Sequence, residues 1–139
     1  MHRKHFQISA ASRELQSVAP IVEAFCAANH IPATISNVMN VTLDEVLSNI
    51  VKYAYDASER GIIDVKLTYS DHRFAATVED VGKPFNPLRS PKQDTSGPLK
   101  DRKQGGLGIL FMKSLMDSVV YDRKDNRNQL TLTIGVPFV

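Results

Sequence analysis

Two polar side chains in one predicted helix have the spacing to act together. Glu45 and Asn49 lie four residues apart in the stretch LDEVLSNIVKYAY. Residues four apart in a helix project from the same face, one above the other. The sequence therefore stacks an acid on an amide within a helix that also has an apolar side to bury.

Two glycine-bearing segments follow this helix in the sequence. In EDVGKPFNP, Asp80 ends a predicted strand and Gly82 comes two residues later. In GGLGI, a predicted helix opens with Gly105, Gly106 and Gly108. Glycines at a helix start let backbone N–H groups converge on an anion, and the helix dipole adds to the attraction. The second segment therefore has the chemistry of a phosphate cradle.

The common nucleotide-binding motifs are absent from the sequence. There is no G-x-x-x-x-G-K-[ST] segment, and GGLGILF neither completes G-x-G-x-x-G nor follows a βαβ unit. A nucleotide would therefore be held by neither a P-loop nor a Rossmann site. The four histidines are scattered without metal-ligand spacing, so a structural zinc site is not expected.

Two helices and a strand are predicted in the first part of the chain. Residues 5–10 predict a short edge strand, and residues 12–30 predict a helix. Ser12 is the expected N-cap of this helix, and Pro20 is expected to kink or restart it. The helix that carries the acid and the amide is expected over residues 36–55, with a buried face at the apolar positions Val38, Val46, Ile50 and Ala54.

The pattern then changes to a period of two. Apolar and polar residues alternate over residues 62–70 and again over 73–80, which predicts an antiparallel hairpin with one covered face. Residues 82–106 lose this pattern, and such a segment is usually functional or disordered. A helix over 107–119 and a second hairpin that turns near Asn126 follow. The expected fold is an α+β two-layer sandwich, a mostly antiparallel sheet with helices on one face, forming a single domain over 1–139.

The bulk composition is that of an ordinary globular domain. The 139 residues carry a net charge of +2, and 42% are hydrophobic, so no nucleic-acid partner is expected. The basic N-terminus lacks the apolar part of a secretory signal, and no apolar run is long enough to span a membrane. Cys26 is the one cysteine, so no intramolecular disulfide can form and a cytoplasmic location is expected.

Taken in order, the three polar segments resemble the boxes of the GHKL ATPase superfamily, whose members have the Bergerat ATP-binding fold. LDEVLSNIVKYAY is similar to the N box, EDVGKPFNP to the G1 box and GGLGILFMKSLMD to the G2 box. The tails PFNP and MKSLMD resemble the bacterial anti-sigma factor serine/threonine kinases of partner-switching systems. The resemblance covers nearly the whole chain, and it implies a flexible ATP lid between the last two boxes.

The resemblance implies a role for each polar residue in binding ATP and Mg²⁺. Glu45 matches the general base and Asn49 the Mg²⁺ ligand. Magnesium prefers few protein ligands beside phosphate and water oxygens, and a carboxylate one turn away can reach the group that attacks the γ-phosphate. Asp80 matches the acceptor of the adenine amine, and Gly82 the residue that lets the backbone approach the base.

The remaining nucleotide contacts are implied for the lid, the G2 box and the last strand. The sequence leaves open which basic lid residue neutralises the γ-phosphate, and whether Thr131 or Thr133 touches the adenine. The phosphate cradle is implied for Gly105, Gly106, Leu107 and Gly108, and the basic lid residues are Lys100, Arg102 and Lys103.

Two departures from the family pattern concern catalysis. Family N boxes often carry a histidine four residues after the asparagine, where this chain has Tyr53. Asp44 competes with Glu45 for the role of base, from a different face of the helix. Without the resemblance, the acid and the amide could also form a solvated helix face, and the glycine segments could be ordinary turns or loop-to-helix junctions.

The implied function is that of a serine/threonine protein kinase. Such a protein transfers the γ-phosphate of ATP to a small STAS-domain antagonist, and can alternatively bind a sigma factor, usually as a homodimer. An ATP-gated binding module without kinase activity is also consistent with the sequence. So is an ATP hydrolase in which Glu45 activates water. A purely structural domain would bind no nucleotide.

Overall fold

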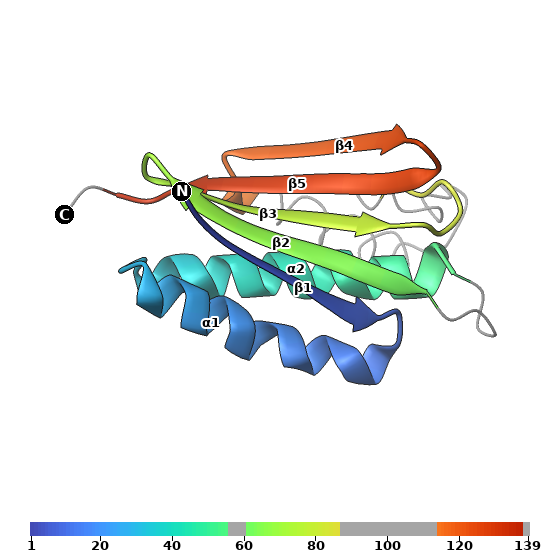
Figure 1. Cartoon of the computed structure of the whole chain (residues 1–139), viewed down its shortest axis with the longest axis horizontal. Coiled ribbons are helices and arrows are strands. Elements are labelled where there is room, and N and C mark those ends of the chain that lie inside the picture. The colour runs from blue at the N-terminus through green and yellow to red at the C-terminus, as the bar shows by residue number, and fades with distance from the viewer. Residues whose placement is uncertain (56–60, 87–113, 138–139) are drawn as a thin grey trace, which may run out of the picture.

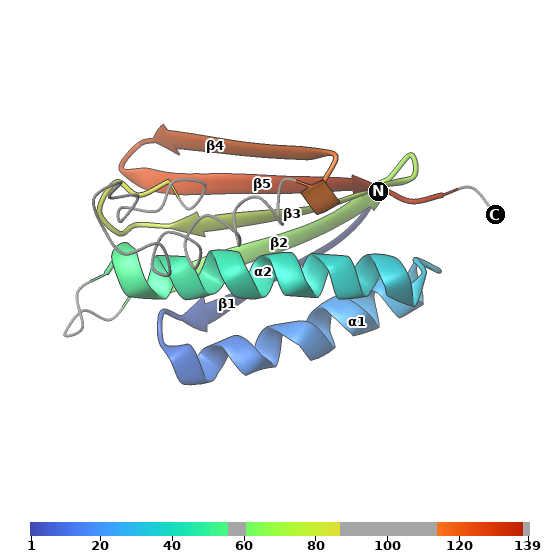
Figure 2. The same ribbon diagram turned by 180° about the vertical axis from the view of Figure 1, so that it is seen from behind.

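The computed structural model describes residues 1–55, 61–86 and 114–137. In these residues, five antiparallel strands form one sheet in the order β1-β2-β3-β5-β4. The helices lie on one face: the sheet is in front of α2 in Figure 1, and α2 is in front of the sheet in Figure 2. The expected α+β sandwich is confirmed. The strands are β1 (His2–Ser9), β2 (Ile62–Ser70), β3 (Arg73–Asp80), β4 (Ser118–Lys124) and β5 (Arg127–Gly135).

The helical layer differs from the sequence prediction at its boundaries. The first helix is divided into a 3₁₀ helix, η1 (Ser12–Ser17), and α1 (Val18–Ala28). Pro20 therefore restarts the helix, since proline is tolerated in a first turn where its missing N–H has no partner to lose. The expected cap at Ser12 is wrong, because Ala11 occupies the N-cap position of η1 and no side chain caps it.

The second helix, α2, spans Ala33–Tyr53 and so begins three residues before the expected start. Pro32 holds the N-cap position with a φ of −57°, and the helix starts directly after it. The expected helix over 107–119 lies mostly outside the described residues. Its end is wrong, because Ser118 already belongs to β4. Strand pairing with β5 takes precedence there over the helical pattern.

The core lies between the sheet and α2. Met39, Leu43 and Val46 of α2 are fully buried, and so are Leu67 and Leu132 of the sheet. Burying each such side chain stabilises the fold by about 1.5–3 kcal/mol. This packing fixes which face of α2 is turned away from the sheet and so remains available for chemistry.

Three chain segments that are distant in sequence meet at one end of the sandwich. The C-terminal end of α2, the end of β3 and the turn between β4 and β5 lie together (Figure 1). Asp125 and Asn126 form that turn with φ values of 54° and 61°, in the left-handed region that asparagine and aspartate tolerate. The expected turn near Asn126 is confirmed, and it places the start of β5 beside the end of β3.

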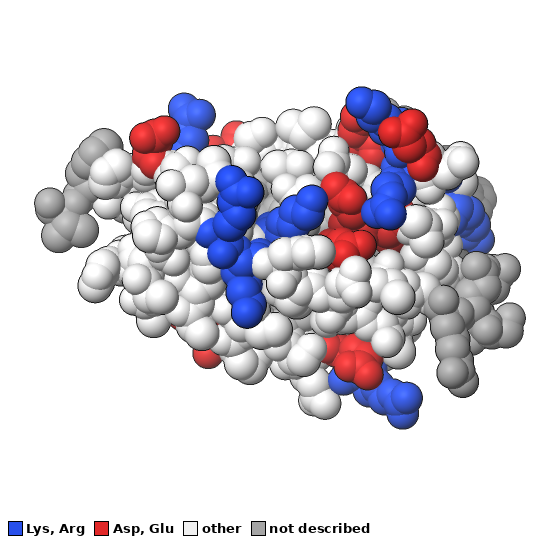
Figure 3. All heavy atoms as spheres, viewed as in Figure 1, with Lys and Arg blue, Asp and Glu red and all other residues white. Residues whose placement is uncertain are grey.

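The helix-free face of the sheet carries charges of both signs (Figure 3). Asp64 Oδ1 lies 2.9 Å from His5 Nε2 and accepts a hydrogen bond from Gln7 at 2.8 Å. Arg127 lies 3.4 Å from Glu79. These contacts link β1 to β2 and β5 to β3 across the open face.

Candidate functional site

The face of α2 that carries Glu45 and Asn49 is only half-buried. Within the part of the chain that the structure describes, neither side chain makes a hydrogen bond or an ion pair. Asp44, the competing acid, is exposed. Glu45 and Asn49 therefore share one face, as the spacing predicts, and their oxygens are available to a ligand.

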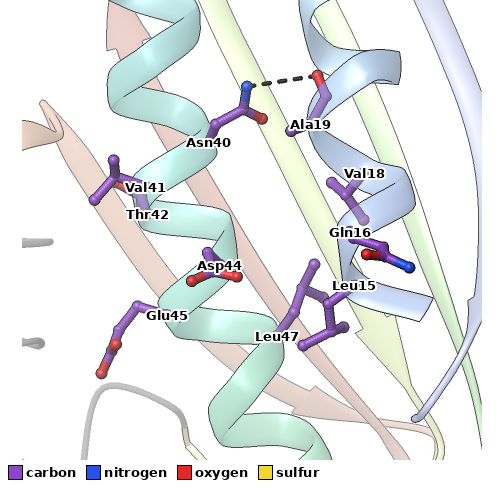
Figure 4. A pocket seen from close by; sticks show the side chains of 10 residues that line it. All are labelled: Leu15, Gln16, Val18, Ala19, Asn40, Val41, Thr42, Asp44, Glu45 and Leu47. Atoms are coloured by element: carbon purple, nitrogen blue, oxygen red, sulfur yellow. Dashed lines mark hydrogen bonds between the residues drawn. The ribbon is translucent and has the colours of Figure 1, made fainter. Parts of the chain in front are cut away.

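A groove lies beside Glu45, between α2 and the η1–α1 segment, with a volume of about 400 Å³ (Figure 4). Leu15, Val18 and Leu47 give it an apolar wall. Asn40 donates a 3.5 Å hydrogen bond to the carbonyl oxygen of Ala19 across it. Glu45 is one of the lining residues, and in Figure 4 its side chain extends from the side of α2 away from α1 and from the apolar wall.

The turn after β3 is tied to the C-terminal end of α2. The N–H of Lys83 donates to the carbonyl oxygen of Ala54 at 3.1 Å, and the N–H of Val81 donates to the hydroxyl of Tyr55 at 3.2 Å. A Cβ at Gly82 would lie 2.6 Å from the carbonyl oxygen of Ala54. Glycine is thus required here by close packing against the helix end, a reason that the sequence did not reveal.

Asp80 lies at the base of this turn and is 2% exposed. Its Oδ1 accepts hydrogen bonds from the N–H of Gly82 and from Asn128 Nδ2, both at 2.9 Å. Among the described residues, no hydrogen bond reaches Oδ2. Burial raises the pKa of the Asp80 carboxyl, while the bonds from Asn128 and Gly82 and the charge of Arg123 act in the opposite direction. Within the described part of the chain, Asp80 is thus a buried carboxylate with Oδ1 fixed by two hydrogen bonds and Oδ2 making none.

Asn128, at the start of β5, is a polar residue of the site that the sequence analysis missed. It is 3% exposed and stands directly across from Asp80 in the β3–β5 register. Its Oδ1 accepts bonds from the N–H of Phe85 at 3.2 Å, the hydroxyl of Tyr121 at 2.6 Å and Arg123 at 3.1 Å. Its Nδ2 also donates to the carbonyl oxygen of Lys83 at 2.9 Å. Asn128 therefore joins the β4–β5 hairpin to the turn after β3.

Thr131 and Thr133, which the sequence left open as adenine contacts, lie on the face of the sheet opposite to Asp80. In β5, Leu130 and Leu132 face the helices and are buried, so the threonines that alternate with them face the open side of the sheet. Asp80 is on the helix side, opposite to them. Tyr53, which stands where family N boxes often have histidine, packs against Phe85 with ring centroids 5.4 Å apart.

Most of the G2 box and all of the lid residues implied for the phosphates lie outside the described residues. This applies to Lys100, Arg102, Lys103, Gly105, Gly106, Leu107 and Gly108.

The described residues contain no group of three or more histidine, cysteine, aspartate or glutamate side chains that could hold a metal ion. This does not conflict with the expected Mg²⁺, which takes most of its ligands from phosphate and water. The amide oxygen of Asn49 makes no hydrogen bond within the described part of the chain, so this residue fits the role of a single protein ligand.

A family model matches most of the chain. The model for the histidine kinase-like ATPase domain matches residues 8–134. The chain belongs to this family. A serine/threonine-protein kinase named BtrW from Bordetella bronchiseptica is 28% identical over 95 residues, covering 68% of this chain and 67% of that protein. The serine-protein kinase RsbW of Oceanobacillus iheyensis is 31% identical over 87 residues, covering 58% of this chain and 54% of that protein.

The match thus spans about half to two thirds of the length of these curated relatives. Among solved structures, the RsbU and RsbW domains of a Mycobacterium tuberculosis protein align with a TM-score of 0.70 and 15% identity. The alignment covers 98% of this chain and 33% of that one, which supports the fold. None of the helices that the structure describes is long and apolar enough to cross a membrane.

Proposed function

We propose that this histidine kinase-like ATPase domain binds Mg²⁺-ATP and acts as a serine/threonine protein kinase in the cytoplasm. The order of the candidate residues along α2 carries the proposal. Asp80 is held at the C-terminal end of the helix, near Ala54. With a rise of 1.5 Å per residue, Asn49 lies about 7.5 Å and Glu45 about 13.5 Å back along the axis from Ala54. Along the helix, the proposed adenine acceptor Asp80 comes first, the metal ligand Asn49 second and the general base Glu45 third. ATP has the same order: adenine, then the phosphates that bind the metal, then the γ-phosphorus that is attacked.

Each described residue has one task in the proposed transfer. Oδ2 of Asp80 accepts a hydrogen bond from the adenine amine, and Asn49 holds the metal through its amide oxygen. Bound Mg²⁺ would neutralise charge on the phosphates. Glu45 takes the proton of the acceptor hydroxyl, whose oxygen attacks the γ-phosphorus as the bond to the leaving ADP oxygen breaks. The G2-box residues and a basic lid residue are proposed for the phosphates.

The groove beside Glu45 favours a protein acceptor over water. An apolar wall formed by Leu15, Val18 and Leu47 gives a peptide segment a surface to pack on, whereas hydrolysis needs none. Both relatives, BtrW and RsbW, are named as protein kinases, which supports the same choice. We propose a STAS-domain antagonist as the acceptor, with a sigma factor as an alternative partner and a homodimer as the working state.

The test is transfer of label from γ-labelled ATP, with Mg²⁺, to STAS-domain proteins encoded in the same genome. Glu45→Gln should lower the rate by about 100-fold or more, the usual contribution of a general base. Asp44→Asn is the matched control, since it makes the same change on the neighbouring exposed acid, and it should transfer at the wild-type rate. If only Asp44→Asn lost the transfer of label, Asp44 and not Glu45 would be the general base.

Two other outcomes would contradict the kinase proposal. ATP binding that changes affinity for a protein partner, with no label moved, would indicate a gated binding module. Phosphate released without an acceptor, at a rate that a STAS protein does not change, would indicate an ATP hydrolase.

A further inference from the structure

The side-chain amide of Asn128 has one possible orientation in this fold. Three donors surround its Oδ1: the N–H of Phe85, the hydroxyl of Tyr121 and the guanidinium of Arg123. Two acceptors face its Nδ2, namely Oδ1 of Asp80 and the carbonyl oxygen of Lys83. A flipped amide would oppose donors with donors or acceptors with acceptors at four of the five contacts, the exception being the Tyr121 hydroxyl, which can also accept. The donors to Oδ1 therefore fix the direction in which Asn128 donates.

This direction has a consequence for Asp80. Both donors to Asp80, Asn128 Nδ2 and the N–H of Gly82, reach the same atom, Oδ1. Oδ1 therefore has no direction left for a ligand, and the carboxylate cannot turn without losing both bonds. Oδ2, which accepts no hydrogen bond within the described residues, is the atom that a purine base can contact.

We propose that Asn128 is a specificity-determining positioning residue: by holding Oδ1 of Asp80, it leaves Oδ2 as an acceptor that reads the 6-position of a purine. This inference rests on the proposed ATP site. A 6-amino group donates to Oδ2, whereas a 6-oxo group places a second acceptor against it. Asn128 itself touches no nucleotide in this scheme and acts through Asp80.

The donor role of Asn128 can be separated from its acceptor role. Asn128→Asp has nearly the same shape and keeps an oxygen facing Phe85, Tyr121 and Arg123. It replaces the donor by an oxygen that faces the Asp80 carboxylate. Two carboxylates in contact cannot both stay charged, so one of them takes up a proton. A proton shared between the facing oxygens lowers the negative charge on Asp80, which weakens Oδ2 as an acceptor for a 6-amino group and repels a 6-oxo group less.

A matched control is the next residue along β5. Gln129 donates to Glu79 Oε1 at 2.7 Å, on the open face of the sheet. Gln129→Glu therefore makes the same chemical change, an amide to an acid against a carboxylate, one position away and on the opposite side. Any effect of lost stability or added charge alone should be shared by the two variants.

The experiment measures dissociation constants for Mg²⁺-ATP and Mg²⁺-ITP, which differ at the purine 6-position, by calorimetry on the full chain. The wild type should prefer ATP by about 10-fold or more, as for a hydrogen bond to a charged group. Asn128→Asp should lower this ratio by about 10-fold, whereas Gln129→Glu should keep it. An unchanged ratio in Asn128→Asp, or an equal fall in Gln129→Glu, would overturn the inference. A wild type that binds neither nucleotide would overturn the proposed function itself.

A measurement on the wild type keeps the inference testable if Asn128→Asp does not fold. The two Nδ2 protons of Asn128 should exchange slowly with solvent and should stay protected when ATP binds, because their acceptors are Asp80 and Lys83. Fast exchange of either proton in the ATP complex would mean that Asn128 turns to contact the base directly, which contradicts a positioning role.

Discussion

Replacing Asp80 by asparagine should weaken ATP binding by at least about 10-fold and yet stabilise the fold at neutral pH. The asparagine carbonyl can take the place of Oδ1 and keep both bonds, from Gly82 and from Asn128. The amide nitrogen of the asparagine then takes the place of Oδ2. A hydrogen-bond donor would face the adenine amine, which is itself a donor. Loss of a hydrogen bond to a charged acceptor alone is worth about 1.5–3 kcal/mol, or about 10- to 150-fold in affinity.

The stability gain follows from the raised pKa of Asp80, which burial causes. Below the pKa of the unfolded chain, both states hold the proton and no penalty exists. As the pH rises through the interval up to the higher native pKa, the unfolded chain loses its proton first, so wild-type stability falls. The fall is about 1.4 kcal/mol for each pH unit of that interval, and the penalty is constant above it. Asp80→Asn carries no such penalty.

The assay combines urea unfolding between pH 4 and pH 7 with calorimetric titration of Mg²⁺-ATP. The stability difference between Asp80→Asn and wild type should grow as the pH rises. Asp64→Asn is the control with the opposite sign. Partial burial alone would raise the pKa of Asp64, but hydrogen bonds from Gln7 and His5 and the charge of Arg127 lower it. The Asp64 carboxylate therefore stabilises the wild-type fold at neutral pH. This stabilisation is lost as the pH falls through the native pKa of Asp64.

Two results would refute this reasoning. If Asp80→Asn binds ATP as tightly as the wild type, Oδ2 is not the adenine acceptor. If Asp80→Asn is less stable than the wild type at pH 7, the contacts of the Asp80 carboxylate offset the cost of burying its charge, and the predicted penalty does not exist.

Three further predictions concern other parts of the site and the core. Gly82→Ala should destabilise the fold by about 1–3 kcal/mol in urea unfolding, because the new Cβ would lie 2.6 Å from a backbone oxygen. Gly135→Ala should cost less, because among the described residues its Cβ would meet only the side chain of Asp117, at 3.1 Å; an equal loss would contradict the packing argument. Asn49→Ala should weaken the binding of Mg²⁺-ATP but leave the binding of metal-free ADP unchanged. Equal losses of affinity for both nucleotides would mean that Asn49 is not a ligand of the metal. Burial raises the pKa of Cys26 to about 11, so iodoacetamide at pH 8 should modify this thiol only on unfolding, and rapid labelling of the native protein would contradict its burial.

The fold was predictable because its hydrophobic pattern is strong. In β2 and β3, alternation alone identified the buried faces, and Val65 and Phe74 are fully buried as expected. The helix boundaries were less predictable, because they depend on backbone caps. Ser12 is a good cap by type, yet the preceding Ala11 takes that position, and Pro32 starts α2 without any side-chain cap.

The candidate site was predictable where its residues are close in sequence. Glu45 and Asn49 needed only the helical period, and Asp80 with Gly82 needed only the family resemblance. Asn128 was missed because its partners come from three segments, and nothing in the local sequence marks it. One signal was present: pairing of the last strand with residues 73–80 puts Asn128 across from Asp80.

The two-residue turn at Asp125 and Asn126 is therefore part of the site, although it contacts no ligand. It pairs Lys124 with Arg127 and so fixes the register of the hairpin. A shift of β5 by one residue would turn every side chain to the other face, moving Asn128 into solvent and bringing Gln129 toward Asp80. Leu130 and Leu132 would leave the core in the same shift, and about 1.5–3 kcal/mol for each of them opposes it. The apolar residues of β5 thus hold Asn128 in place, the residue that we propose to set the purine specificity through Asp80.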